Sequence, residues 1–229
     1  MSSNTVPLEY GKYYHIYNRG VNGCDLFMER INYEHFLRLY DKYLLLVADI
    51  YAWVLMKNHF HFLVRIKEEE EMEYLPPKIL NPDRSGRPCQ VKERKNPSGF
   101  YKPDGVLYSK KKPLPEKQFG HLFNSYAKAF NKKYQRTGSL FERPFHRKEI
   151  TDENYLKFLV YYIHHNPVHH GIVEDMSEYP RSSYLIFLST ETTNLKRKEV
   201  IEWFDDLDNL IFFHRQQHDL NNIKDMLID

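Results

Sequence analysis

Two histidines separated by one residue give the clearest chemical signal in the sequence. They lie in the run Asn-His-Phe-His-Phe-Leu-Val-Arg-Ile at 58–66, whose apolar side chains alternate as in a β-strand. Side chains alternate between the two faces of a strand, so His59 and His61 share one face and can bind one cation. Two histidines on the solvated side of an amphipathic strand would explain an isolated His-x-His equally simply.

A tyrosine and an asparagine four residues apart form the second candidate. The apolar spacing of 154–166 predicts a helix that begins at a Thr151 cap and ends near Asn166, because Pro167 discourages its continuation. Tyr162 and Asn166 then project from the same face and offer a phenol and an amide oxygen to one site. The chain has 18 tyrosines, so most must be core or surface residues, and Tyr161 is nearly as good a candidate.

A basic stretch interleaved with aromatic residues is the third feature. Residues 117–148 contain eight lysines and arginines against one acidic residue, Glu142. Bases neutralise phosphates and exposed aromatic rings stack on unpaired nucleobases, so this stretch favours nucleic-acid binding. A solvated helix face above a buried aromatic stripe explains its helical part as well. The residues expected to contact nucleic acid are Lys128, Lys132, Lys133, Arg136, Arg143, Arg147 and Lys148.

The surrounding elements predict how these segments are positioned. Their order is strand, helix, strand, strand, helix, strand, which is the α+β, ferredoxin-like βαββαβ sandwich with an antiparallel sheet and helices on one face. The predicted strands cover 13–18, 50–56, 60–66 and 140–150, and the helices cover 32–48, where Asn32 is the expected cap, and 118–134. The 151–166 helix follows, and the C-terminal part carries a further helix over 199–210.

The segment 67–116 interrupts this pattern. It opens with a run of glutamates and holds eight of the chain's twelve prolines, with too few apolar residues for a core of its own. We therefore expect a long flexible insertion in a catalytic domain over 1–188, followed by an extension of unknown role over 189–229.

Composition excludes several classes of protein. The net charge of +2 says little about partners, and no stretch approaches the roughly 20 apolar residues that span a bilayer. The N-terminus lacks the pattern of a secretion signal, so a cytoplasmic protein without membrane contact is expected. Two cysteines, Cys24 and Cys89, are too few for a disulfide framework or a thiolate metal cluster.

Several motifs occur in the order of a known family. They are Tyr-His-Ile-Tyr-Asn-Arg-Gly at 14–20, Leu-Met-Lys-Asn-His-Phe-His-Phe-Leu-Val at 55–64, Gly-Ser-Leu-Phe-Glu-Arg-Pro-Phe at 138–145, Tyr-Ile-His-His-Asn-Pro-Val-His-His-Gly-Ile-Val at 162–173 and Tyr-Pro-Arg-Ser-Ser-Tyr at 179–184. With these motifs the chain resembles the single-tyrosine HUH transposases (His-hydrophobic-His), especially the REP-associated tyrosine transposases. The similarity covers about residues 10–188, with the insertion unmatched.

The resemblance implies roles for the candidate residues. His59 and His61 would bind Mg²⁺ or Mn²⁺ with Asn166 as an amide ligand, and Tyr162 would be the nucleophile, with Tyr161 and Tyr126 as alternatives. The implied activity is metal-dependent cleavage and transfer of single-stranded DNA near a hairpin, through a 5′-phosphotyrosine intermediate, by a homodimer. Two other functions stay open: a non-catalytic nucleic-acid-binding module of the same fold, and a nickase like the rolling-circle initiators.

Overall fold

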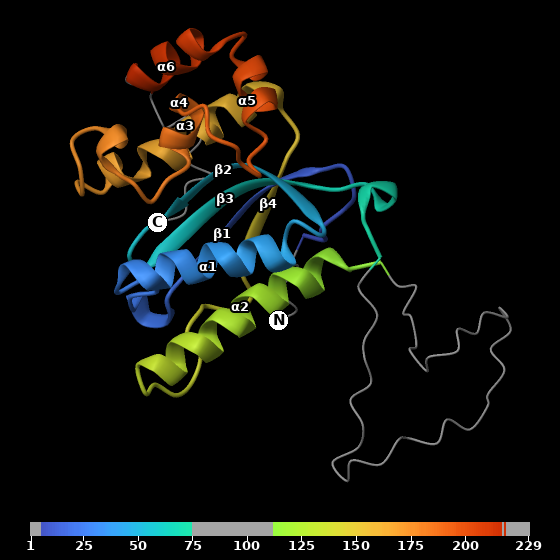
Figure 1. Ribbon diagram of the computed structural model, residues 1–229, viewed down its shortest axis with the longest axis vertical. Helices are drawn as coiled ribbons and strands as arrows, with labels where there is room; N and C mark the ends of the chain where they lie inside the picture. The colour runs from blue at the N-terminus through green and yellow to red at the C-terminus, as the bar shows by residue number, and fades with distance from the viewer. Residues whose placement is uncertain (1–5, 75–111, 217, 219–229) are drawn as a thin grey trace, which may run out of the picture.

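The computed structural model describes residues 6–74, 112–216 and 218, and within these ranges four strands form one sheet in the order β2-β3-β1-β4. All neighbouring strands are antiparallel. The strands are β1 (Tyr13–Arg19), β2 (Ala48–Leu55), β3 (His59–Ile66) and β4 (His146–Ile150). Helices α1 (Arg30–Tyr43) and α2 (Pro115–Lys133) pack side by side on one face of the sheet (Figure 1). The predicted α+β, ferredoxin-like architecture is confirmed.

Aromatic side chains fill the space between this sheet face and the two helices. Phe36 of α1 lies with its ring centroid 5.2 Å from that of Phe60 and 6.1 Å from that of Phe62. Phe123 of α2 lies 5.7 Å from Phe60. The alternation of β3 therefore turns its phenylalanines toward α1 and α2 and its histidines toward the opposite face.

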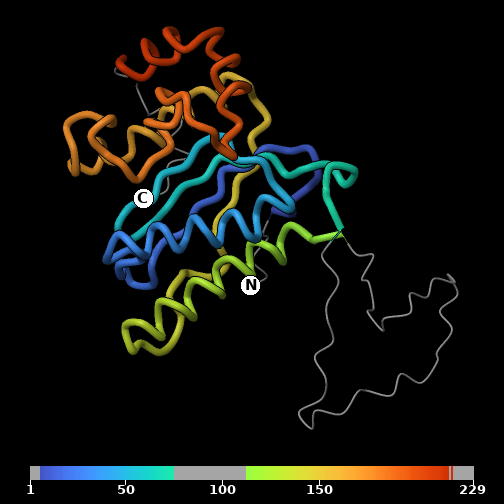
Figure 2. The backbone as a smooth tube through the Cα atoms, viewed as in Figure 1, coloured from blue at the N-terminus to red at the C-terminus, as the bar shows by residue number. Residues whose placement is uncertain are grey.

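Helix α3 (Glu153–His169) covers that opposite face (Figures 1 and 2). It begins after Asp152, whose carboxylate accepts a hydrogen bond from Tyr155 N at 3.0 Å, so the predicted Thr151 cap is wrong by one residue. It also continues past Pro167, because a proline in the last turn interrupts little helix beyond it. Since α3 closes this face, all eight residues of β2 are buried.

The C-terminal part of the chain packs around α3. Its helices are α4 (Tyr184–Leu188), α5 (Arg197–Trp203) and α6 (Leu207–Arg215). The single helix predicted over 199–210 is wrong: Asp205 has a φ of 71°, and the Asp206 side chain caps α6 by accepting from Asn209 N at 2.7 Å. Val200 and Leu210 are fully buried in the main core, so the described residues from 189 to 216 contribute to the fold.

Other predicted boundaries also move. Asn32 is the third residue of α1 instead of its cap, and its side-chain oxygen accepts from Met28 N and Glu29 N at 2.9 Å each. Strand β4 begins at His146, later than predicted. Before it, Phe141 forms only an isolated bridge to Gly20, the residue after β1. None of the described helices is long and apolar enough to cross a membrane.

The segment 67–116, predicted to be flexible throughout, has structured ends. Glu71 forms two hydrogen bonds with Arg65 of β3, at 3.0 and 2.9 Å, and Pro115 already belongs to α2. These ends are therefore anchored to the domain. The remainder, 75–111, lies outside the described residues.

Candidate active site

The two histidines of β3 lie on the sheet face covered by α3, as their spacing predicts. His61 is paired with Tyr17 of β1 and His59 with Arg19, so these four side chains share one face. His61 is only 2% exposed. The simple alternative of solvated surface histidines is therefore wrong, because α3 buries this part of the strand.

Helix α3 brings the predicted tyrosine and asparagine to the same histidines. Asn166 Oδ1 lies 3.1 Å from His59 Nε2. The Tyr162 ring meets that of His61 edge-on, with 5.5 Å between centroids and 80° between planes. His59 and His61 of β3 and Tyr162 and Asn166 of α3 thus lie together, although the two segments are distant in the sequence.

The other tyrosine candidates lie elsewhere. Tyr126 is buried between α1 and α2, on the far side of the sheet, where its hydroxyl donates to the Leu26 carbonyl at 2.5 Å. Tyr161 stacks on His165 at 4.9 Å and belongs to a separate apolar cluster. Of the three candidates, Tyr162 is the one whose ring contacts the histidine pair.

The atoms of His59 and Asn166 are arranged to bind a cation. Asn58 Oδ1 lies 2.8 Å from His59 Nδ1 and accepts a proton from it in the tautomer that leaves a lone pair on Nε2. This is the tautomer that binds a metal through Nε2. That lone pair faces another acceptor, Asn166 Oδ1. Two adjacent octahedral ligands at about 2.1 Å from a metal lie about 3 Å apart, close to the observed spacing. Without a cation, the contact is a hydrogen bond, in which either a proton on His59 Nε2 or the Asn166 Nδ2 group is the donor.

His61 supplies a further free ligand atom. Its Nδ1 lies 2.9 Å from Nε2 of His15, a residue of β1 that is 1% exposed. Its Nε2 is buried and has no hydrogen-bond partner among the described residues. When His61 donates from Nδ1 to His15, its Nε2 holds a lone pair, the form that binds metal.

Both rings of this pair are neutral. Burial lowers the pKa of His15 to about 3, and the positive charge of Lys148 adds to the effect. Burial also holds the pKa of His61 well below its usual value, with His15, His59 and His170 contributing. Within the described residues no three His, Cys, Asp or Glu side chains form a metal cluster, and the Asn166 amide oxygen beside His59 adds a ligand atom of another kind. This mixed nitrogen and oxygen set fits Mg²⁺ or Mn²⁺.

An open cavity of about 330 Å³ lies against the two histidines. The His59 ring contacts that of His170 at 5.1 Å, and Tyr17 lies between the rings of His61, at 5.8 Å, and His146, at 5.0 Å. Arg19 and Glu142 form an ion pair of 2.8 Å at the cavity wall. Phosphate-sized groups can enter here, next to the histidines.

Four residues around the histidine pair carry no signal that was used to predict the site from the sequence. His15 and Tyr17 are two apart, like His59 and His61, so the same alternation argument would have put them on one strand face. His146 and His170 carry no comparable local signal. Their place in the site depends on pairing between distant strands and on where α3 ends.

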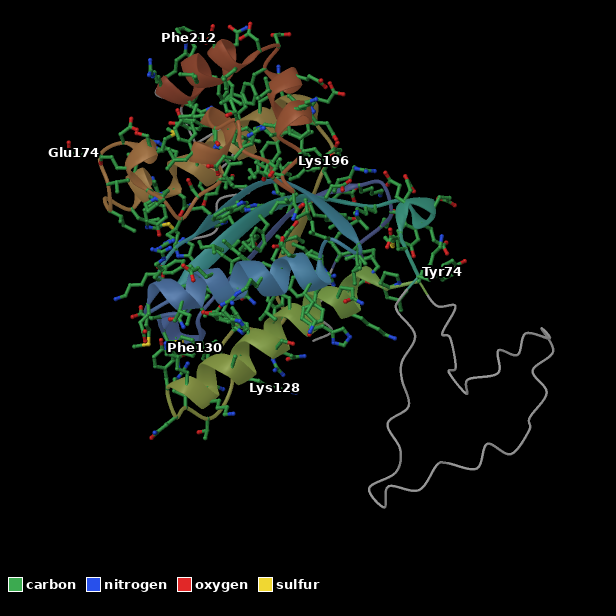
Figure 3. The ribbon with its side chains drawn as sticks, viewed as in Figure 1. Tyr74, Lys128, Phe130, Glu174, Lys196 and Phe212 are labelled. Atoms are coloured by element: carbon green, nitrogen blue, oxygen red, sulfur yellow. The ribbon has the colours of Figure 1, made fainter. Side chains whose placement is uncertain are left out.

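The seven predicted nucleic-acid contacts do not form one surface. Lys128 is exposed on α2, on the far side of the sheet from α3 (Figure 3). Lys132 is exposed on the same helix. Lys133 pairs with Glu29 at 3.0 Å, and Arg136 lies over the Phe130 ring at 5.8 Å. These four residues therefore lie away from the histidine pair.

The basic residues near β4 are divided between the two faces. The Arg147 guanidinium lies 4.9 Å from the Phe145 ring, with its side chain 10% exposed, on the face of α2. Lys148 is paired with His15 and shares its face, and Arg143 is exposed in the loop before β4. The aromatic rings expected to stack on bases are mostly core residues, so that expectation is wrong for Phe119, Phe123, Tyr126, Phe130 and Phe141.

Comparison with known proteins agrees with this geometry at the level of the fold. No protein-family model and no curated protein matches the sequence. Among solved structures, a REP-associated tyrosine transposase bound to a REP hairpin matches with a TM-score of 0.52, over 83% of this chain and 87% of that one. The chain has the fold of that transposase. Identity is only 13%, so this likeness shows the fold alone.

Proposed function

We propose that the chain is a metal-dependent single-stranded DNA nuclease and strand transferase of the tyrosine transposase type. The convergence of Tyr162 and Asn166 from α3 with His59 and His61 from β3 carries this proposal. A protein that only binds nucleic acid has no use for a phenol beside two imidazoles, one of them fully buried. The transposase that shares the fold, itself bound to a DNA hairpin, supports the same class of substrate.

Each residue has a role that follows from its chemistry. His59, His61 and Asn166 would hold Mg²⁺ or Mn²⁺, and a bound cation would draw charge from the scissile phosphate and orient it. Tyr162 attacks the phosphorus, so an oxygen–phosphorus bond forms to the phenol while the bond to the 3′-oxygen breaks. The phenol loses its proton and the departing 3′-oxygen gains one. The 5′-phosphotyrosine keeps the energy of the ester, so a later 3′-hydroxyl can displace the tyrosine and rejoin the strand.

Burial of the nucleophile sets a condition on this reaction. Tyr162 is 1% exposed and does not line the cavity against the histidines. Its hydroxyl must therefore turn toward that cavity when DNA binds, a change of the kind that completes many sites only in the substrate complex.

The decisive experiment is a search for a covalent complex. The protein is incubated with hairpin-bearing single-stranded oligonucleotides and Mn²⁺ or Mg²⁺, and adducts are separated on a denaturing gel. We expect adducts with the natural chain and with Tyr161→Phe, and none with Tyr162→Phe, which should still bind DNA. Adducts that persist in Tyr162→Phe would assign the nucleophile elsewhere, and DNA binding without any adduct would favour the non-catalytic module.

A nickase like the rolling-circle initiators would share this chemistry. Offering the adduct an oligonucleotide with a free 3′-hydroxyl distinguishes the two, because a transferase joins the strands. The homodimer implied by the resemblance remains a proposal, which sedimentation of the intact chain with and without hairpin DNA would test.

A further inference from the structure

A second cavity adjoins the first at the edge of the sheet. It has a volume of about 530 Å³ and lies between α2 and the loop that precedes β4. Asn18 and Glu142 line both cavities. Asn18 Nδ2 donates to the Glu142 carbonyl at 3.2 Å, and Glu142 N donates to the Arg19 carbonyl at 3.0 Å. A strand of DNA that leaves the histidine cavity would therefore pass directly over this fixed junction into the second one.

A glycine inside α2 lines this cavity. Gly120 lies inside a 19-residue helix, where glycine is less favourable than alanine. A Cβ atom built at this position meets nothing within 4 Å. Neither a close neighbour nor a left-handed backbone thus requires glycine here, and an added side chain would stand in open space at a residue that lines the cavity.

The lining suits an unpaired nucleotide. Phe145 is partly exposed and supplies the accessible aromatic surface of the lining. The buried Phe123 packs behind it, with 5.2 Å between the ring centroids. Asn124 is exposed and offers an amide that can both donate and accept at the edge of a base. Arg143 is exposed at the same cavity and has no ion pair among the residues that the structure describes, which suits a phosphate. Proteins bind flipped-out bases with this combination of apolar wall, edge hydrogen bonds and basic side chains.

We propose that this cavity, the Gly120 pocket, binds one unpaired nucleobase next to the scissile phosphate. The proposal rests on the DNA-cleaving function proposed above and deepens it, because it gives the site a contact to a base. The continuity of the two cavities favours a base of the bound strand over a peptide or a second copy of the chain.

The test fills the pocket by enlarging the side chain at position 120. Gly120→Leu places a branched side chain in the open space, and Gly120→Ala adds one methyl group as the matched control. Both changes favour the helix, so both proteins should remain folded by circular dichroism. Affinity for a fluorescent single-stranded oligonucleotide is measured by anisotropy in a Tyr162→Phe background without metal. We expect Gly120→Leu to bind about ten-fold more weakly and Gly120→Ala to bind as the parent does.

An abasic scan makes the test specific. Oligonucleotides are prepared that each lack one base. At one position, loss of the base should weaken binding to the parent protein about ten-fold. The same loss should leave binding to Gly120→Leu unchanged. Asn124→Leu, at an exposed position, provides a second filled pocket should Gly120→Leu fail to fold. Normal binding by the filled variants, or the same abasic effect in parent and variant, would overturn the pocket while covalent adducts still support the nuclease. A chain that binds no single-stranded DNA would overturn both proposals.

Discussion

Replacing His15 gives the most direct test of how the metal site is organised. In the metal-binding form, His61 donates its Nδ1 proton to His15 Nε2 across 2.9 Å and keeps a lone pair on its own Nε2. In His15→Leu this acceptor is gone. The His61 proton can then move to Nε2, and metal binding must force it back to Nδ1, where it has no partner in a buried environment.

The size of the effect follows from that unsatisfied proton. A buried donor without an acceptor costs about 1–3 kcal/mol, which corresponds to a loss of about 5- to 150-fold in affinity. Groups that hydrogen-bond to metal ligands typically contribute 10- to 100-fold. We therefore expect His15→Leu to bind Mn²⁺ roughly 10- to 100-fold more weakly than the natural chain.

Calorimetric titration with Mn²⁺ in the absence of DNA measures this affinity without relying on catalysis. His15→Gln is the matched control, because its amide oxygen lies about where Nε2 of the imidazole was and still accepts the proton. Nitrogen NMR of His61 in the metal-free proteins should show the proton on Nδ1 in the natural chain and in His15→Gln, but not in His15→Leu. Equal Mn²⁺ affinity for folded His15→Leu and the natural chain would refute the reasoning.

Two further predictions concern acid stability and DNA contacts. Burial lowers the pKa of His214 to about 4 in the native chain, against about 6.5 in the unfolded chain. Between about pH 4 and about pH 6.5 the unfolded chain therefore binds a proton at this residue and the native chain does not. Stability should therefore fall as pH drops from about 6.5 to about 4, by up to about 1.4 kcal/mol per pH unit from this residue. Urea denaturation should show a shallower pH dependence for His214→Gln, and an unchanged slope would contradict the assignment. For DNA, Lys148→Gln should weaken single-strand binding and reduce the slope against log salt by about one. Lys42→Gln, exposed on α1 and lining neither cavity, should do neither. Equal effects in anisotropy titrations would mean that DNA also contacts the α1 side.

The sequence predicts those parts of the site that depend on local periodicity. The alternation of β3 put His59 and His61 on one face, and the four-residue spacing on α3 put Tyr162 beside Asn166. The same alternation separates Arg147 from Lys148. As neighbours on one strand they point to opposite faces of the sheet, so they cannot belong to one basic surface.

Other features depend on contacts between distant segments, which local patterns do not encode. The His15–His61 bond joins residues 46 apart and follows from the register of β1 with β3. The aromatic stripe of α2 was equally compatible with a core and with a binding surface, because amphipathicity does not say which partner covers the apolar side. Only packing against α1 and the sheet decides that it is core.

The surroundings of α3 bear on how the buried Tyr162 reaches DNA. His214 Nδ1 donates to the Leu210 carbonyl at 2.8 Å, so its Nε2 accepts from His164 Nδ1, and His164 Nε2 in turn accepts from the Ser183 hydroxyl. Ser183 Oγ also accepts from Trp53 N of β2 at 2.9 Å. This series of hydrogen bonds connects α3 to both α6 and the sheet.

Moving the whole helix would break several of these buried hydrogen bonds, at about 1–3 kcal/mol for each group left unsatisfied, and would expose much of its apolar face as well. Turning out one tyrosine ring exposes about 150–250 Å², or roughly 4–6 kcal/mol at about 25 cal/mol per Å², and contacts with the bound strand can replace part of that. Rotation of the Tyr162 side chain is therefore the cheaper route. It also leaves Asn166 on a stationary helix, so the cation ligands stay in position while the nucleophile moves.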